Sequence, residues 1–301
     1  MTTTLDRFRG CLLGLACGDA VGTTVEFRER GTFKPVKDMT GGGPFSLQAG
    51  EWTDDTSMAL CLAASLTALN AFDPRDQMER YCRWMTAGYM SSNGSCFDIG
   101  TATRQALFRF QESGEVYSGS TNPRSAGNGC LMRLAPVPMF FYSDLAETRT
   151  RSVESARTTH GASECLEATD LFAVMLHRAL HGQDKKSVLE GHAWQEYQSP
   201  GIRAIAQASY LGKAENEIRS SGYVVESLEA ALWCFATTQT FEDAILKAAN
   251  LGGDADTVAA ICGQVAGAHY GASGIPQRWI ERLVMKGEIG GFAEKLCRRM
   301  N

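Results

Sequence analysis

The segment Gly50–Leu66, GEWTDDTSMALCLAASL, decides how the chain is organised. A turn glycine and a tryptophan precede Thr53-Asp54-Asp55-Thr56, and an apolar run of helical character follows. Threonine or aspartate at the start of a helix satisfies backbone N–H groups that have no partner within the helix. The helix dipole also favours ionised carboxylates there. A helix needs one cap, so two adjacent aspartates between two threonines exceed the structural requirement.

The same arrangement returns near the other end of the chain. Leu251-Gly-Gly-Asp254-Ala-Asp256-Thr257 leads into a helix of small residues that we predict over 258–269. Two acidic helix starts so far apart in sequence indicate one shared metal site in the folded protein.

The candidate ligands at this site all offer oxygen, and no histidine or cysteine adjoins them. Oxygen ligands suit Mg²⁺, Mn²⁺ or Ca²⁺ better than zinc or copper. Converging carboxylates raise each other's pKa values unless cations are present, and two dications about 3.5–4 Å apart form a known hydrolytic device. The alternative, two ordinary helix caps with extra surface acids, explains one motif better than it explains both. The candidates are Glu26, which stands between Val25 and Phe27, and Thr53, Asp54, Asp55, Asp254, Asp256 and Thr257.

Composition describes an ordinary globular protein of one large domain or two small ones. Hydrophobic residues make up 44% and charged residues 21% of the 301 residues. The net charge of −5 and the lack of a basic run argue against nucleic-acid binding. Two divalent cations would bring that charge to −1, so a metal enzyme accounts for part of the acidity.

The ten cysteines are scattered and form no Cys-x-x-Cys motif, which excludes zinc-ribbon and thioredoxin-type sites. We interpret them as small buried hydrophobes in a reducing cytosol. The N-terminus lacks the shape of a signal peptide, and no apolar stretch reaches the length of a membrane span. The sequence therefore predicts a cytoplasmic protein without a membrane partner.

Helical spacing of apolar residues predominates, and no long stretch alternates with period two. Gly10, Gly14 and Gly18 would be costly in an exposed first helix, so we expect other backbones to press against them. We predict that this helix ends in a turn at 18–22 and that residues 28–52 form a loop. The prediction is a single all-α domain, residues 1–301, with helices at 4–18, 54–69, 75–90, 101–111, 130–141, 144–158, 163–180, 187–197, 201–211, 226–236, 241–249 and 258–269, a helix initiated by Pro276 and a final helix.

Three further features are candidates for substrate contacts. Gly127-Asn128-Gly129, preceded by Ser125, could expose backbone N–H groups to a phosphate, although Asn-Gly is also simply a turn. His160, at a helix boundary, is more often a capping or packed residue. Asp98, taken alone, is better explained as the N-cap of the helix at 101–111.

Together these motifs resemble the ADP-ribosylglycohydrolase family. The resemblance runs from about residue 5 to 272, and its specific part is the pair Thr-Asp-Asp and Gly-Asp-x-Asp-Thr. Within this family, the chain is similar to bacterial members that remove ADP-ribose from arginine, such as the dinitrogenase-reductase-activating type. The matching elements are Gly18-Asp19-Ala20, Val25-Glu26-Phe27, Trp52-Thr53-Asp54-Asp55-Thr56, Asp98-Ile99-Gly100, Gly127-Asn128-Gly129 with Met132-Arg133, His160-Gly161, and Gly252-Gly253-Asp254-Ala255-Asp256-Thr257.

The resemblance implies an all-α fold with two Mg²⁺ or Mn²⁺ ions at the floor of a cleft. Glu26 would be a mobile gate or base beside the metals, and Asp55 and Asp98 would share in catalysis. His160 matches a substrate-side histidine, but Gly161-Ala162-Ser163 departs from the usual proline-containing continuation. The metal ligands would be Thr53, Asp54, Asp55, Asp254, Asp256 and Thr257, and the substrate contacts Asp98, Gly100, Ser125, Gly127, Asn128, Gly129 and His160.

The implied activity is hydrolysis of ADP-ribose from modified protein side chains, with N-linked arginine first. One alternative is an O-linked substrate, either serine or a small molecule such as O-acetyl-ADP-ribose. Another is a binding role, as an immunity protein that occludes an ADP-ribosylating toxin. The intact ligand set argues against a purely structural role. Expected partners are an ADP-ribosylated protein, ADP-ribose and, for the immunity role, an ADP-ribosylating toxin or transferase.

Overall fold

Helix α1 (Thr4–Gly22) and helix α12 (Ala255–Tyr270) pack against each other along most of their length and form the centre of the computed structural model, which describes residues 2–298. A methyl group on Gly10 would lie 2.2 Å from the carbonyl oxygen of Gly267, and one on Gly14 would lie 2.3 Å from that of Gly263. The two backbones therefore touch, as the glycine spacing predicted. The glycines allow this close contact and do not form a turn. Helix α1 continues through Gly22, so the predicted turn at 18–22 is wrong.

The remaining elements are also helical, and the described residues contain only isolated β-bridges in place of strands. The all-α prediction is confirmed. The α-helices besides α1 and α12 are α2 (Asp54–Leu69), α3 (Pro74–Ala87), α4 (Thr101–Ser113), α5 (Pro136–Phe140), α6 (Leu145–Arg157), α7 (Ser163–Leu180), α8 (Lys185–Leu189), α9 (Pro200–Ala206), α10 (Val224–Ala236), α11 (Phe241–Asn250), α13 (Gln277–Arg282) and α14 (Lys286–Arg298).

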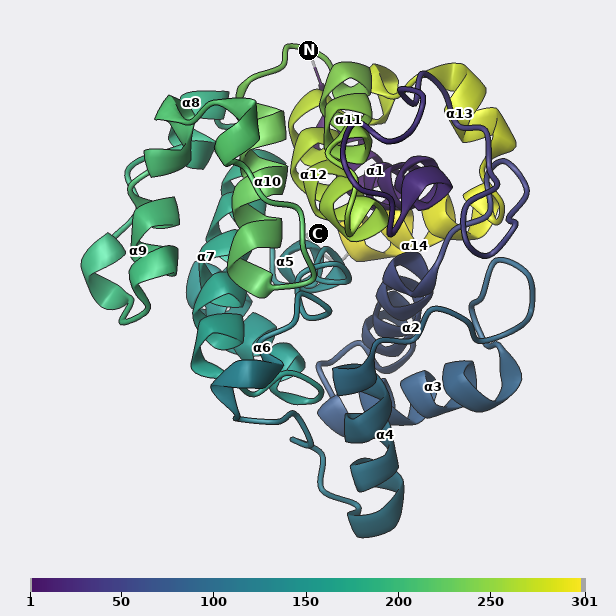
Figure 1. The fold of residues 1–301 in the computed structure, drawn as a ribbon. Helices are drawn as coiled ribbons and strands as arrows, with labels where there is room; N and C mark the ends of the chain where they lie inside the picture. The colour runs from purple at the N-terminus through teal and green to yellow at the C-terminus, as the bar shows by residue number, and fades with distance from the viewer. Residues whose placement is uncertain (1, 299–301) are drawn as a thin grey trace.

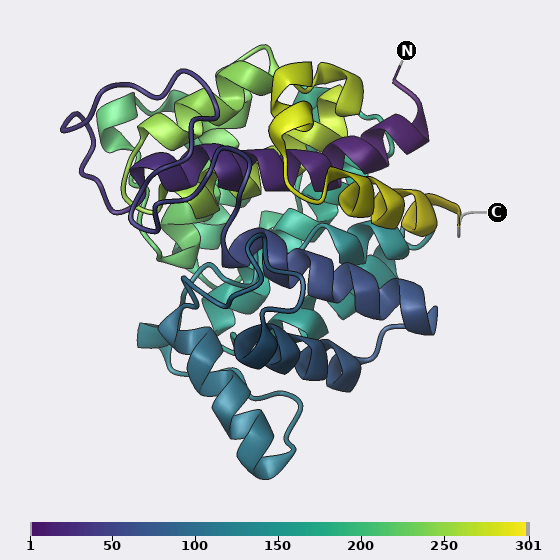
Figure 2. The ribbon, with the colours of Figure 1, turned by 90° about the vertical axis from the view of Figure 1, so that its right-hand side faces the viewer.

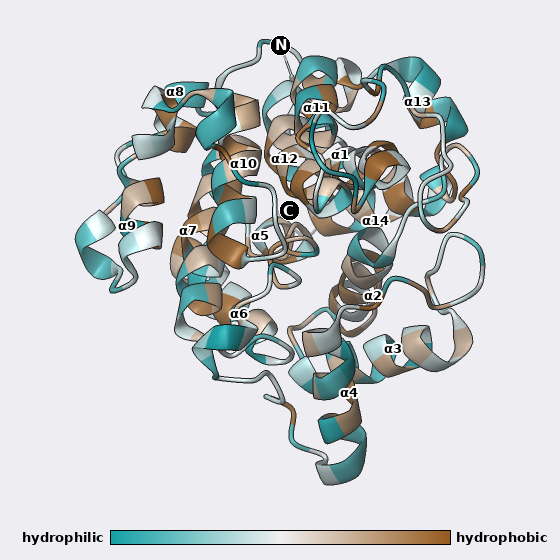
Figure 3. Ribbon diagram, in the orientation of Figure 1, coloured by the Kyte–Doolittle hydropathy of each residue, from teal (hydrophilic) through white to brown (hydrophobic). Residues whose placement is uncertain are grey.

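The helices surround the α1–α12 pair in layers. Helices α2, α3 and α4 lie on one side, with α4 projecting farthest from the centre (Figure 1 and Figure 2). Helices α7 and α10 pack on α12 from another side, and α14 packs on both α1 and α2. Apolar residues gather on the inward faces of these helices (Figure 3). One large buried cluster runs from Phe8 to Leu296, and a second, smaller cluster lies between α2, α3 and α4.

The segment predicted as a helix at 130–141 is helical only in α5. Residues 129–133 form turns. The buried side chain of Gln264, in α12, makes hydrogen bonds to the backbone there. Its NH₂ group donates to the carbonyls of Leu131 and Met132, and its oxygen accepts from the N–H of Ala135. A side chain distant in sequence thus replaces the hydrogen bonds that a helix would supply. Pro136 then begins α5 at its first turn, where proline is favoured.

The segments predicted as helices at 187–197 and 201–211 are also shorter than expected. Helix α8 ends at Leu189, and Gly191 follows with a φ of +71°. Helix α9 ends at Ala206, because Ala208 adopts a left-handed conformation with φ +57°. Short 3₁₀ turns, Trp194–Glu196 and Ser209–Gly212, complete these segments.

The loop at 28–52 is long but fixed at several points. Asp38 accepts hydrogen bonds from Arg278, Trp279 and Arg282 around α13. Arg30 donates to the carbonyls of Glu215, Ile218 and Leu251. These contacts hold the loop beside the end of α1 and the start of α12, where it contributes to the site described below. No helix in the described part of the chain is long and apolar enough to cross a membrane.

Candidate metal centre and substrate cleft

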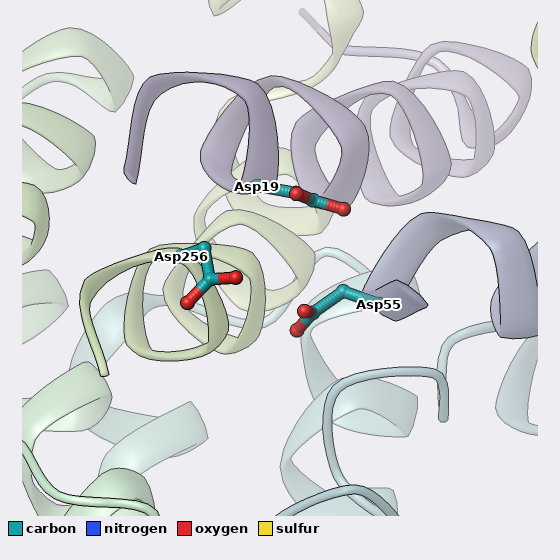
Figure 4. Close-up of side chains that lie close together, drawn as sticks. All are labelled: Asp19, Asp55 and Asp256. Atoms are coloured by element: carbon teal, nitrogen blue, oxygen red, sulfur yellow. The ribbon is translucent and has the colours of Figure 1, made fainter. Parts of the chain in front are cut away.

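Three helices bring one carboxylate each to a common point. Asp19 comes from the last part of α1, Asp55 from the first turn of α2 and Asp256 from the first turn of α12 (Figure 4). One oxygen from each lies within 4.8 Å of the others, and all three side chains are buried. The two acidic helix starts of the sequence therefore do meet, as predicted.

A second group of carboxylates adjoins the first. Oxygens of Glu26, Asp98 and Asp256 also lie within 4.8 Å of one another. Asp256 is common to both groups and joins them into one acidic cluster. The prediction that Asp98 caps α4 is wrong: the N-cap is Gly100, and no side chain caps this helix. Asp98 has a φ of +57°.

Asp19 fixes the geometry of α2, a role that the sequence analysis missed. Its Oδ1 accepts from the N–H and hydroxyl of Thr53, at 2.8 and 2.9 Å. Its Oδ2 accepts from the N–H and hydroxyl of Thr56, at 3.0 and 2.6 Å. The side chain of Thr53 makes no capping bond, so an aspartate from α1 caps α2 in its place. The available signal was an acid among the small and apolar residues of the first helix.

The oxygens in this cluster that can accept a hydrogen bond outnumber the hydrogen-bond donors near them. The hydroxyl of Thr53 lies 2.9 Å from Asp19, 3.1 Å from Asp55 and 3.2 Å from Asp256, yet it carries one proton. The hydroxyl of Thr257 lies 3.4 Å from Oδ2 of Asp55. Within the acidic cluster, the buried oxygens without any hydrogen-bond partner are Glu26 Oε2, Asp55 Oδ1 and Asp256 Oδ1. Such buried acceptors are costly unless a cation or a proton satisfies them.

The electrostatics of the cluster lead to the same conclusion. Burial, followed by the charges of Asp98 and Asp254, raises the pKa of Glu26 to about 9. Burial, followed by Asp19 and Asp254, raises the pKa of Asp98 to about 7. Burial is also the main cause of the raised pKa values of Asp54, Asp55 and Asp256. A divalent cation removes this penalty, and carboxylate and hydroxyl oxygens are suitable ligands for Mg²⁺ or Mn²⁺. The residues present therefore fit a metal.

A cavity of about 890 Å³ opens over the acidic cluster. Its size suits a ligand larger than a single sugar. It brings together most of the residues predicted from sequence for metal and substrate. Those in its wall are Glu26, Asp54, Asp98, Gly100, Gly127, Asn128, Gly129, His160, Asp254 and Thr257. Thr53, Asp55 and Asp256 are buried beneath them.

The glycine-rich loop makes several contacts within the protein. The N–H of Gly127 donates to Ser125, and that of Asn128 donates to Gly222. The side-chain amide of Asn128 donates to Asp254 at 2.6 Å and to Ser227 at 2.8 Å. Asn128 thus ties the loop to the acidic cluster. A role of Gly127, Asn128 and Gly129 as phosphate ligands stays a prediction.

Ser125 lies apart from the acidic cluster. It lines an adjoining cavity of about 540 Å³, which shares Gly127 and Gly222 with the first and also contains Tyr223. Its hydroxyl donates to the carbonyl of Asn122.

His160 is buried against the glycine-rich loop. A methyl group on Gly129 would lie 2.7 Å from its Cε1, so only glycine fits there. Its Nδ1 lies 2.7 Å from the hydroxyl of Thr159, which accepts from the buried guanidinium of Arg133. Burial, together with the charge of Arg133, lowers the pKa of His160 to about 3, so its ring is neutral. These contacts explain its placement without a capping role.

Three comparisons relate this chain to known proteins. The family model described as ADP-ribosylglycohydrolase matches residues 1–301. The chain is 48% identical over 302 residues to "ADP-ribosylarginine hydrolase Tri1" of Pseudomonas putida (strain GB-1), covering 98% of this chain and 79% of that protein. It is 33% identical over 287 residues to "ADP-ribosyl-[dinitrogen reductase] glycohydrolase" of Rhodospirillum rubrum, covering 94% and 92%. A solved chain from an "ADP-ribosylglycohydrolase-related protein complex" superposes with a TM-score of 0.87 at 42% identity, covering both chains fully.

Proposed function

Because the chain belongs to the ADP-ribosylglycohydrolase family, we propose that it is a metal-dependent hydrolase that removes ADP-ribose from modified arginine side chains of proteins. The observation that carries the proposal is the acidic cluster, with its three unpartnered buried oxygens, beneath a cavity large enough for ADP-ribose. The names of the relatives that share this sequence over nearly its full length support arginine as the linkage.

Two Mg²⁺ or Mn²⁺ ions are the proposed cofactors. The buried oxygens of Asp55 and Asp256 that have no hydrogen-bond partner support cation binding in the acidic cluster, and the number of two ions follows the resemblance to the family. When bound, the ions would supply Lewis-acid polarisation and orientation of the ribose hydroxyls. The residues that would hold them are Thr53, Asp54, Asp55, Asp254, Asp256 and Thr257, with Asp19 keeping Thr53 and α2 in position.

The other polar residues of the cavity have distinct proposed roles. Glu26, with a free buried oxygen facing the cluster, is positioned to take a proton from the attacking water. Asp98 stabilises positive charge that develops on the sugar as the leaving group departs. Gly127, Asn128 and Gly129 form the cavity wall at the proposed position of the diphosphate, although the N–H groups of Gly127 and Asn128 already donate to Ser125 and Gly222. The neutral His160 supports this wall from behind. Gly100 and Ser125 complete the substrate side.

The proposed working unit is the whole of residues 1–301 acting as one domain in the cytoplasm. All ten cysteines are free, which supports a reducing compartment. The proposed partner is an ADP-ribosylated protein, with ADP-ribose as the product.

The test is release of ADP-ribose from an arginine-ADP-ribosylated peptide, followed by chromatography. We expect release with Mg²⁺ or Mn²⁺, none after dialysis against a chelator, and recovery when the cation returns. Asp256→Asn should be inactive, whereas Glu288→Gln, at an exposed position of α14, should behave as wild type. Release that persists in excess chelator would exclude the metal-dependent hydrolase. Release only from a serine-linked peptide would assign the O-linked alternative.

A further inference from the structure

Three phenylalanines form a row beside the acidic cluster. The rings of Phe27 and Phe45 meet edge to face, with centroids 6.5 Å apart, and those of Phe45 and Phe97 are 5.3 Å apart. The three residues come from separate segments: the turn after α1, the loop at 28–52 and the loop before α4. We call Phe27, Phe45 and Phe97 the aromatic row.

The backbone places two of these rings next to carboxylates. Phe27 directly follows Glu26, and Phe97 directly precedes Asp98. The N–H of Phe27 donates to the carbonyl of Gly253, which fixes it beside Asp254 as well. Phe27 and Phe45 line the same cavity as Glu26, Asp54 and Asp98.

The core does not account for Phe27. The residue is 67% exposed, and its φ of +61° is unfavourable for a bulky side chain. An exposed ring on a left-handed backbone gains little from folding. A ligand that covers this ring would explain why the backbone holds it there.

Charge decides which part of the substrate suits the aromatic row. The wall near it carries Glu26, Asp54, Asp98 and Asp254, and Arg104 is the only lysine or arginine among the cavity residues in the described chain. The faces of aromatic rings attract a planar cation and offer nothing to a diphosphate, and Asp98, which is not one of the proposed metal ligands, attracts the same cation. A guanidinium meets both conditions.

We propose that the aromatic row is the subsite for the arginine side chain, with the guanidinium covered by the rings of Phe27 and Phe45. The proposal rests on the proposed function and adds the residues that select the leaving group. Phe97 supports Phe45 from behind and keeps Asp98 close to the same cation. An uncharged leaving group such as serine would gain no cation–π contact from this row.

The test uses Phe45→Leu, with Phe27→Leu as a second variant because the Phe27 ring contributes little to the core. We expect kcat/KM for an arginine-ADP-ribosylated peptide to fall about three- to thirtyfold in each. The Kd for ADP-ribose with Mg²⁺, which lacks the leaving group, should stay within about twofold, and Phe45→Tyr should restore most of the activity. Phe108→Leu removes another exposed ring, on α4 and outside the cavity wall, and should change neither quantity.

The outcomes separate this inference from the proposed function. If the wild type does not act on arginine-linked ADP-ribose, the proposed function itself fails. If the wild type acts and both leucine variants keep full kcat/KM, the aromatic row is not the leaving-group subsite. An equal loss of ADP-ribose affinity in folded Phe45→Leu and Phe27→Leu, checked by thermal melting, would assign the row to the ADP portion and overturn the inference.

Discussion

Glu26 is the residue whose surroundings most resemble those of a proton acceptor. It is 3% exposed, and its Oε2 has no hydrogen-bond partner. Unlike Asp19, it is not held by bonds from threonine residues. At this scale, the structure separates carboxylates that hold the protein together from those whose oxygens remain available.

We expect Glu26→Gln to bind ADP-ribose nearly as well as the wild type but to turn over at least about a hundredfold more slowly, because an amide cannot accept the proton from water. Calorimetry with ADP-ribose and Mg²⁺ gives the affinity, and single-turnover hydrolysis gives the rate. Loss of both metal and ADP-ribose binding would instead make Glu26 a ligand on which the site depends.

Asp98 and Asp256 differ in how many of the two carboxylate groups of the acidic cluster they belong to. Asp256 belongs to both groups and Asp98 to one. We therefore expect Asp98→Asn to weaken Mg²⁺ binding less than Asp256→Asn does. Asp98→Asn should still slow hydrolysis of arginine-linked ADP-ribose about ten- to a hundredfold, since a charge-assisted contact is worth about 1.5–3 kcal/mol. Titration calorimetry of both variants checks the order, and the reverse order would contradict it.

Among the elements, the contact between α12 and the turns at 129–133 depends on one buried side chain. Gln264 makes three hydrogen bonds to backbone groups there, at 2.8 to 3.0 Å. The turns directly follow the glycine-rich loop and so carry the cavity wall. This connection links the packing of α12 to the substrate side of the site.

We expect Gln264→Met to lower the free energy of unfolding by about 2 kcal/mol or more, because it removes three buried hydrogen bonds and only the carbonyl of Leu131 keeps another donor, the N–H of Leu134. Urea unfolding followed by circular dichroism measures the change. Gln105→Met, at an exposed position of α4, is the control and should shift the free energy by less than about 0.5 kcal/mol. Similar values for the two variants would show that water replaces the lost bonds.

For the whole molecule, the acidic cluster brings α1, α2 and α12 together in one place. A cation held there binds only the folded chain, so it should stabilise the entire fold. At about a hundred times its Kd, Mg²⁺ should add about 2.7 kcal/mol. For a protein of this size we expect the melting temperature to rise by about 5 °C.

Differential scanning fluorimetry with and without chelator measures this shift. Asp256→Asn should show little response to Mg²⁺, because it removes the carboxylate common to both groups. An equal rise in the wild type and in this variant would place the stabilising cation elsewhere.

The sequence alone determined the helical class and several helix boundaries. Helices α2 and α7 have the predicted bounds, 54–69 and 163–180. Local features suffice for this, since apolar spacing, capping residues and proline act over a few residues. The same local features marked Thr53, Asp55 and Asp256, because two acidic helix starts exceed what capping requires.

Only the tertiary structure decided which groups meet. Asp19 caps a helix 34 residues away, and Gln264 holds a turn about 130 residues away. The glycines of α1 lie inside the helix and do not end it. They are needed because the backbone of α12 occupies the space that side chains there would fill. Asp98 does not cap α4, because Gly100 occupies the N-cap position. The backbone of Asp98 is left-handed, and its carboxylate lies close to those of Glu26 and Asp256. These outcomes depend on long-range packing, which no local pattern encodes.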